Sequence, residues 1–185
     1  MNVEKHAAAP AREELEALEA ARERFISQWG AMGGSWGINR TMAQIHALLL
    51  SKLEPLTTDQ VMEELKISRG NANTNLRDLV GWGLVRSIYF KGDRKEYFEA
   101  EKDIWKMFCI IARERKRREL EPAVSVLQFC RDHTRNLKSE EGRQLHTVTR
   151  DLESFISKGE RFLEALSQNE ESAVFPRLMK LLSRK

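Results

Sequence analysis

The sequence predicts a mainly α-helical fold with one β-hairpin near its middle, and three observations predict it. Apolar residues recur with helical spacing over most of the 185 residues. Two neighbouring segments instead alternate with period two on either side of a Gly-Asp pair, as in a hairpin. The composition, 41% hydrophobic and 32% charged, is that of a globular protein with a charged surface.

The first helix is expected to follow Pro10 and to be long and amphipathic. Its apolar stripe consists of Leu15, Leu18, Ala21, Phe25 and Trp29. The glycine-rich segment 30–37 (GAMGGSWG) is expected to break or loosen this helix, because glycine is a poor helix former. A second helix is predicted at about 40–53, with Met42, Ile45, Leu48 and Leu49 on its buried side.

A capping signal marks the start of the next helix. Thr57 and Gln60 have the spacing of a capping box, in which each side chain bonds the backbone amide of the other residue. Leu56 is placed to pack against Val61. This helix is expected to end near Lys66 and to lead through a short turn into another helix.

That following helix begins with residues that are unfavourable in helices. Residues 66–84 read KISRGNANTNLRDLVGWGL, with Ser68 as the expected N-cap and Gly81 or Gly83 at the end. Asparagine, threonine and glycine disfavour the helix, yet they cluster in its first half. These residues are tolerated because the opposite side of the helix is anchored in the core of the domain. On a helical wheel that anchor consists of Ala72, Leu76, Leu79 and Val80.

A β-hairpin is predicted where LVRSIYF and RKEYFEA flank Gly92-Asp93, a two-residue turn signal. The predicted register pairs Arg86 with Glu99 and Ile88 with Tyr97, both favourable across strands. The order of elements, which is a capped helix, a three-residue turn, a second helix and a hairpin, is that of a winged helix-turn-helix domain.

The remainder of the chain is predicted to be helical. Helices are expected at about 103–120, 122–138, 141–168 and 173–184, with Pro122 and Pro176 near two of their starts. The terminal helices carry more apolar surface than one small winged domain can cover, which predicts a homodimer. The stripes concerned are Leu15, Leu18 and Phe25, and Leu152, Phe155 and Phe162. The predicted organisation is an N-terminal dimerisation helix at 1–37, a winged helix-turn-helix domain at 38–101 and a helical dimerisation region at 102–185.

The polar face of the helix that begins at Ser68 has the chemistry of a DNA-reading surface. Asparagine pairs bidentately with adenine and arginine with guanine. A glycine near the positive end of a helix lets the backbone approach a phosphate. A solvated surface is the simpler alternative, although solvated faces normally favour Glu, Lys and Gln.

Basic residues concentrate in the same region. Between Lys66 and Lys95 there are seven basic and two acidic residues, whereas the whole chain carries only +3. This distribution predicts a local polyanion contact. Lys91, Arg94 and Lys95 surround the hairpin tip, where cations enter the minor groove or hold phosphates, and Asp93 is expected to orient Arg94. The alternative is a soluble hairpin edge on which lysines oppose aggregation.

The residues predicted to contact double-stranded DNA are Ser68, Arg69, Gly70, Asn71, Asn73, Thr74, Arg77, Lys91, Asp93, Arg94 and Lys95. The motif SRGNANTNLRDLVGWGLV followed by KGDRKEYFEA resembles the MarR-type winged-helix regulators, most closely their GbsR group. The upstream FISQWGAMGGSWGINRTMAQIHALLL is similar as well. The resemblance implies a homodimeric transcription regulator, often a repressor, whose DNA affinity responds to a small ligand. It also implies DNA contact by the recognition helix at 68–77 and by Asp93-Arg94.

A small-molecule effector is a further expectation. Trp29, Trp36 and Trp105 are candidates to line its pocket, because aromatic faces hold quaternary ammonium groups. Core packing is the commoner role of tryptophans at helical spacing. Some members of the GbsR group respond to choline-type ligands, but no motif in this sequence identifies such a ligand.

Other functions find no support in the sequence. Cys109, Cys130 and His133 lack the tight spacing of a metal site, so no metal or cofactor is predicted. There is no nucleophile elbow, paired-histidine motif or cofactor-binding glycine pattern, so the chain is not expected to be an enzyme. The basic segment 113–120 (RERKRREL) is interpreted as a solvated helix face, with a flanking contact to the DNA backbone as the alternative.

The chain is expected to be cytoplasmic. Its longest apolar run, MFCIIA, is too short to cross a bilayer, and two cysteines without a disulfide framework fit a reducing compartment. The competing functional class is a winged-helix protein-interaction module that does not bind DNA. Such a module has no need of a basic, asparagine-rich face.

Overall fold

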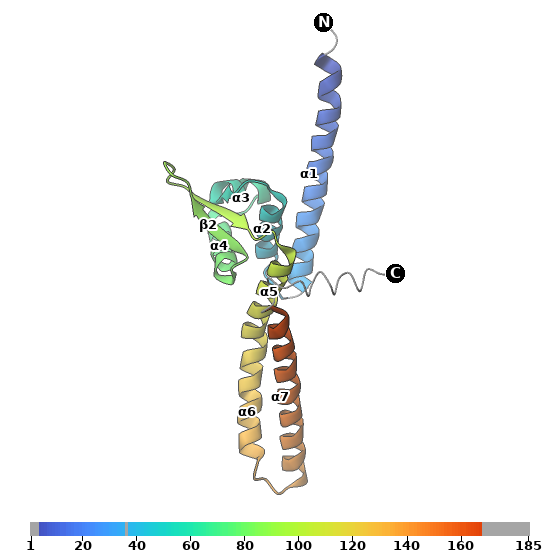
Figure 1. Cartoon of the computed structure of the whole chain (residues 1–185), viewed down its shortest axis with the longest axis vertical. Coiled ribbons are helices and arrows are strands. Elements are labelled where there is room, and N and C mark those ends of the chain that lie inside the picture. The colour runs from blue at the N-terminus through green and yellow to red at the C-terminus, as the bar shows by residue number, and fades with distance from the viewer. Residues whose placement is uncertain (1–3, 36, 168–185) are drawn as a thin grey trace. The chain divides into compact units, whose positions relative to one another are not determined.

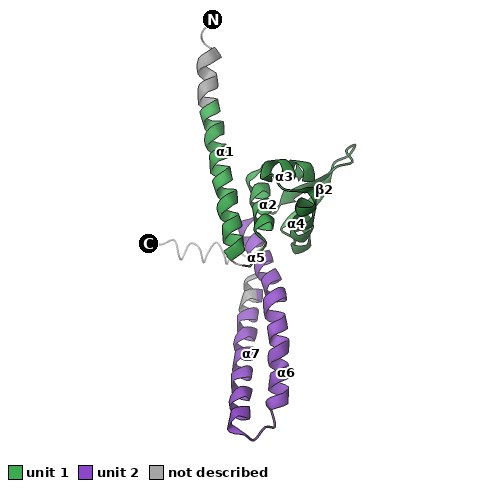
Figure 2. Cartoon of the chain, turned by 180° about the vertical axis from the view of Figure 1, so that it is seen from behind, with its two compact units in different colours: residues 1–102 green, residues 103–185 purple. Residues whose placement is uncertain are grey.

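The computed structural model describes the backbone of residues 4–35 and 37–167 and confirms a mainly helical chain with a winged helix-turn-helix (Figure 1). Its elements in chain order are α1 (Glu4–Ser35), α2 (Arg40–Ser51), β1 (Leu56–Thr57), α3 (Thr58–Leu65), α4 (Arg69–Trp82), β2 (Val85–Tyr89), β3 (Glu96–Ala100), α5 (Ile104–Arg115), a π-helical segment (Lys116–Leu120), α6 (Glu121–Thr134) and α7 (Glu140–Ser167). They form two compact units, Met1–Lys102 and Asp103–Lys185 (Figure 2). The helix predicted at 173–184 lies outside the described residues.

The helix α1 is longer than predicted at both ends. It begins at Glu4, in an alanine-rich stretch ahead of Pro10, and it continues as far as Ser35. Alanine is the best helix former, which favours the early start. The predicted break within the glycine-rich segment is therefore wrong up to Ser35.

Close packing explains the glycines in α1. Gly30 and Gly33 are buried where α1 packs on α2. A Cβ atom added at Gly30 would lie 2.5 Å from Cγ of Gln44, and one added at Gly33 would lie 2.6 Å from Cβ of Ala43. The absence of a side chain at these two positions therefore lets the two helix backbones approach closely.

Replacing Gly33 by alanine is expected to lower the free energy of unfolding by roughly 1–3 kcal/mol, because the added methyl group overpacks the contact with Ala43. Gly34→Ala is the matched control. A Cβ atom there meets nothing within 4 Å, so the better helix former should raise stability by up to about 1 kcal/mol. Urea unfolding of the full chain measures both variants. Equal changes in the two would contradict the proposed role of Gly33 in the contact between α1 and α2.

The core of the first unit lies between α2, α3, α4 and the small sheet. Its fully buried side chains include Ile45, Leu48, Val61, Leu76 and Phe98. The predicted capping box is confirmed: the Gln60 amide donates to the Thr57 hydroxyl at 3.3 Å, and the Thr57 amide donates to the Gln60 side chain at 2.8 Å. The N-cap predicted at Ser68 is confirmed as well, because its hydroxyl accepts a hydrogen bond from the Asn71 amide at 3.3 Å.

The hairpin has the predicted register, with Arg86 opposite Glu99 and Ile88 opposite Tyr97. The two-residue strand β1 also pairs with β3, which gives a three-stranded antiparallel sheet in the order β1-β3-β2. The central strand β3 is thereby held on both sides.

The turn of the hairpin differs from the prediction. The strands end at Tyr89 and Glu96, and the Asp93 amide donates to the Phe90 carbonyl at 3.1 Å. Gly92 occupies the third position of this four-residue turn, Phe90 to Asp93. Its φ of 90° is a backbone conformation that favours glycine. The central pair is therefore Lys91-Gly92 rather than Gly92-Asp93.

In the second unit α5 and α6 are not separated by a loop. The π-helical segment joins them, and the Glu121 amide donates to the Lys116 carbonyl. This wider turn comes directly before Pro122, which has no amide proton to donate, so the helix continues where the sequence predicted a new start. The helix α6 then ends at Thr134 rather than near 138 and packs along α7 (Figure 1).

Candidate nucleic-acid interface

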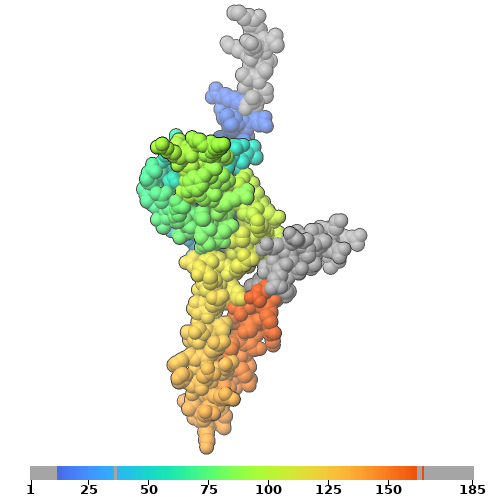
Figure 3. All heavy atoms as spheres, turned by 60° about the vertical axis from the view of Figure 1, so that its left-hand side comes forward, coloured from blue at the N-terminus to red at the C-terminus, as the bar shows by residue number. Residues whose placement is uncertain are grey.

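The helix α4 has one buried and one exposed face. Ala72 and Leu76 have no exposed surface and Leu79 is 1% exposed, which confirms these three members of the predicted anchor, whereas the fourth, Val80, is half-buried. The predicted polar residues are exposed without exception: Ser68, Arg69, Gly70, Asn71, Asn73, Thr74 and Arg77. In the space-filling view the green atoms of α4 and the hairpin face the viewer (Figure 3). The structure thus leaves these polar side chains accessible to a partner.

Asn71 is supported by a neighbour that the sequence analysis did not single out. Asn75 is 3% exposed, and its side-chain amide donates to the Asn71 side chain at 2.7 Å and to the Asn71 carbonyl at 2.8 Å. Its burial is visible only in the structure, so no pattern in the sequence singles it out. Through these hydrogen bonds Asn75 restricts the orientation of Asn71.

The start of α3 contacts two predicted residues of α4. Arg69 forms an ion pair with Asp59, and the Thr58 hydroxyl lies 3.4 Å from the side-chain oxygen of Asn73. The side chains of the Arg69 pair are more than half exposed, so this pair contributes little stability. Its effect is to direct the Arg69 side chain toward Asp59 at the start of α3.

Arg77 is held by the wing. Its two terminal nitrogens donate to the two carboxylate oxygens of Glu96 on β3, at 2.9 and 2.6 Å. The guanidinium carbon also lies 5.9 Å from the centroid of the buried Phe98 ring. Ser87 on β2 donates to the same carboxylate at 2.7 Å. Glu96 was not among the predicted residues, because it is nineteen positions from Arg77 in sequence.

The hairpin tip is organised by Asp93. Its carboxylate accepts hydrogen bonds from the Lys95 amide at 2.9 Å and from the Tyr97 hydroxyl at 2.7 Å. These bonds hold the pKa of the Asp93 carboxyl below its ordinary value, so the group is ionised at neutral pH. Asp93 therefore fixes the backbone of the tip, whereas the sequence analysis expected it to orient the side chain of Arg94.

The cations of the tip are accessible. Lys91, Arg94 and Lys95 are exposed, as is Asp93. Phe90 packs edge-on against Tyr97 with ring centroids 4.9 Å apart, which stiffens the base of the tip. The tip thus presents three positive charges on a defined loop that belongs to the same unit as α4.

The tryptophans predicted to line an effector pocket lie in different parts of the chain. Trp29 of the first unit packs against Phe25 and His46, with ring centroids at 5.5 and 6.3 Å. Burial lowers the pKa of His46 to about 4, so its ring is neutral at neutral pH. Trp105 of the second unit stacks on Phe108 at 5.4 Å. Trp36 lies outside the described residues, and the shared pocket stays a prediction.

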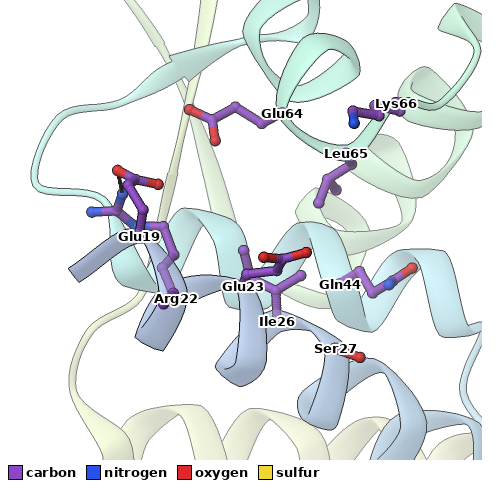
Figure 4. A pocket seen from close by; sticks show the side chains of 10 residues that line it. Glu19, Arg22, Glu23, Ile26, Ser27, Gln44, Glu64, Leu65 and Lys66 are labelled. Carbon is purple, nitrogen blue, oxygen red and sulfur yellow. Dashed lines mark hydrogen bonds and ion pairs between the residues drawn. The ribbon is translucent and has the colours of Figure 1, made fainter. Parts of the chain in front are cut away.

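A cavity of about 580 Å³ in the first unit lies between α1, α2 and the end of α3 (Figure 4). Three carboxylates line it, those of Glu19, Glu23 and Glu64, together with Arg22, which pairs with Glu19. The described lining of this cavity includes no aromatic side chain, so it differs from the aromatic pocket that the sequence analysis predicted.

The basic segment 113–120 is ion-paired within the second unit. Arg117 pairs with Glu114, Arg115 with Glu119, and Lys116 with Glu164. These pairs favour the interpretation as a solvated helix face, because three of its cations already have acidic partners.

Two further sequence expectations concern metals and membranes. Cys109 is buried and Cys130 is half-buried, and the described residues hold no cluster of three or more metal-ligating side chains. Within residues 4–35 and 37–167, no helix has the length and apolar character needed to cross a membrane.

Comparisons with known proteins agree with this geometry. No family model matches the chain. The HTH-type transcriptional repressor GbsR of Bacillus subtilis (strain 168) is 28% identical over 115 residues, which are 62% of this chain and 63% of GbsR. The chain is thus similar to GbsR. The resemblance to the GbsR group that the recognition-helix and wing motifs predicted is thus confirmed.

Two other B. subtilis proteins resemble this GbsR-like chain. The putative HTH-type transcriptional regulator YvaV is 21% identical over 54% of the chain and 56% of its own length. The HTH-type transcriptional repressor OpcR is 20% identical over 51% of each. The GbsR-like chain therefore spans between about half and two thirds of the length of these relatives.

A solved structure shares the fold. A crystal structure of a transcriptional regulator matches with a TM-score of 0.64 and 21% sequence identity, over 82% of the GbsR-like chain and 99% of that protein. At 82% of the chain, this match covers more than the first unit alone, so it includes helical segments outside the winged domain.

Proposed function

We propose that this chain is a sequence-specific DNA-binding transcriptional regulator, and specifically a repressor. The observation that carries the proposal is the exposed polar face of α4 beside a structured hairpin tip with three accessible cations. Asn71 and Arg77 supply the donors and acceptors that read base edges, and Lys91 and Arg94 supply charges for phosphates or the minor groove. The names of GbsR and OpcR as repressors support the direction of regulation.

The regulator is proposed to act as a homodimer. On α7 four apolar side chains at helical spacing are exposed by 47–76%, namely Leu145, Val148, Leu152 and Phe155. On α6 Val126 and Phe129, one turn apart, are about 60% exposed. Apolar surface of this extent favours burial against a second copy. The first helix adds Leu15, Leu18 and Phe25, which are also exposed, whereas the side chain of Phe162 lies outside the described part.

A two-fold dimer of winged domains fits a two-fold symmetric operator, because symmetry then repeats the contacts of one half-site in the other. A small-molecule effector completes the proposal, as the resemblance to the GbsR group implies. The competing function is a protein-interaction module, which would use the same exposed helix without selecting a DNA sequence.

Selection of duplexes from a random pool by the full chain tests the proposal. We expect a two-fold symmetric sequence to be enriched and to bind more tightly than its scrambled version at physiological salt. The logarithm of the binding constant should fall linearly with the logarithm of the salt concentration, by about 0.9 for each phosphate neutralised. Repeating the selection with candidate effectors tests ligand response. Equal affinity for selected and scrambled duplexes would favour the interaction module instead.

A further inference from the structure

The contact between Arg77 and Glu96 uses only part of the arginine. A guanidinium carries five N–H donors in a fixed plane. Glu96 accepts from the two terminal nitrogens, so it occupies the edge at the end of the side chain. The second edge, formed by Nε and one terminal nitrogen, does not donate to Glu96. Glu96 is the one described residue that accepts hydrogen bonds from this guanidinium, and the Arg77 side chain is 62% exposed.

The free edge matches one class of partner on DNA. A planar pair of donors fits a planar pair of acceptors, and guanine presents O6 and N7 in the major groove. An arginine that is free to rotate loses conformational entropy when it makes this contact, whereas one already held in place loses less. The Glu96 carboxylate thus orients Arg77 before DNA binds. It does not occupy the guanidinium edge that would contact the guanine.

We propose that Glu96 is the positioning residue for Arg77, which it holds from the wing so that the free guanidinium edge reads one guanine in each half-site. This inference rests on the proposed DNA-binding function and adds a residue that makes no DNA contact itself. It also joins the two parts of the domain, because the base-reading helix and the wing are then oriented by one ion pair.

Two further observations support the positioning role. The hydrogen bond from Arg77 keeps the pKa of the Glu96 carboxyl below its ordinary value, so the pair is ionised at neutral pH. The carboxylate is itself held, since Ser87 donates to it at 2.7 Å and its side chain is only 18% exposed. A largely covered carboxylate that accepts hydrogen bonds from Ser87 as well as from Arg77 has little freedom, and this limits the movement of the arginine that it holds.

The hairpin offers a matched control. Glu99, on the same strand, pairs with Arg86 at 2.7 Å, and its side chain is 24% exposed. Glu99→Gln and Glu96→Gln remove the same charge from the same strand, so both should alter non-specific attraction to DNA in the same direction. Only Glu96→Gln releases an arginine of the recognition helix.

The experiment measures the binding of the full chain to the selected operator and to each of its single-base variants. The wild type should discriminate against changes of one guanine by roughly 5- to 150-fold, the range expected for a bidentate contact. Glu96→Gln should reduce that ratio at least about fivefold at this guanine alone, while its affinity for scrambled DNA stays equal or rises. Glu99→Gln should keep the ratio. Glu96→Asp keeps the charge but shortens the reach, so it should also lose discrimination without gaining affinity for scrambled DNA.

The outcomes separate the inference from the function. Should Arg77→Ala and the double variant Arg77→Ala/Glu96→Gln show the same base preferences, Glu96 acts through Arg77 as proposed. If Glu96→Gln retains full discrimination, or weakens binding equally for every duplex, the positioning role of Glu96 is overturned. The proposed function as a DNA-binding regulator is then unaffected. If the wild type itself selects no sequence, the proposed function fails and the inference fails with it. Thermal unfolding of each variant identifies any effect that comes from a loss of folding.

Discussion

Replacing Leu152 and Phe155 together by glutamate is expected to convert the proposed dimer to a monomer at micromolar concentrations. Both side chains lie on the exposed stripe of α7, 47% and 76% exposed. An apolar side chain that becomes buried contributes roughly 1.5–3 kcal/mol, and two-fold symmetry makes each substitution count twice. The dissociation constant of the dimer should therefore rise by roughly 1,000-fold or more. Analytical ultracentrifugation measures it directly.

The control substitution is Leu53→Glu. Leu53 is 89% exposed and belongs to the first unit, whereas the stripe belongs to α7 of the second, and the change makes the same replacement of leucine by glutamate. It should leave the dimer intact. The double variant should also bind the symmetric operator much more weakly, because the two half-sites are no longer bound by one molecule. A double variant that still sediments as a dimer would place the interface elsewhere, with the stripe of α1 as the next candidate.

The parts of the fold that sequence reasoning predicted correctly are those decided by local chemistry. The capping box of Thr57 and Gln60 depends on residues three apart, and the hairpin register depends on two short alternating segments. Features decided by tertiary contacts were missed. The glycines of α1 were expected to break or loosen a helix, yet Gly30 and Gly33 allow the close approach of α2. The strand β1 has only two residues and so no periodicity to detect.

The same distinction holds at the candidate interface. The exposed face of α4 follows from the spacing of its apolar residues, which sequence alone reveals. The residues that hold the exposed side chains in place cannot be identified from this spacing. Asn75 belongs to the anchoring side of the helix, and Glu96 is on a strand whose position beside α4 depends on the whole domain. Sequence reasoning therefore names the side chains that face outward more reliably than those that hold them.

The helix and the wing are expected to contribute differently to binding, and three alanine variants separate them. Asn71→Ala and Arg77→Ala should each relax preference at particular base pairs, at a cost of roughly 1–3 kcal/mol for each base no longer read. Arg94→Ala should weaken binding almost uniformly or mainly at A·T-rich flanks, because the minor groove distinguishes base pairs poorly. Its salt dependence should become shallower by about one unit for each phosphate that Arg94 neutralises in the wild type.

Binding to a panel of single-base operator variants at two salt concentrations measures these differences. Arg86→Ala is the matched control for Arg94→Ala, because it removes an exposed arginine from the same hairpin at the end remote from the tip, where Arg86 pairs with Glu99. It should change affinity and salt dependence less than Arg94→Ala does. A change of base preference in Arg94→Ala, together with none in Arg77→Ala, would reverse the two roles. Unchanged affinity in Asn71→Ala, Arg77→Ala and Arg94→Ala would contradict DNA binding through this face. The three residues represent both of its proposed parts, the base-reading helix α4 and the cationic hairpin tip.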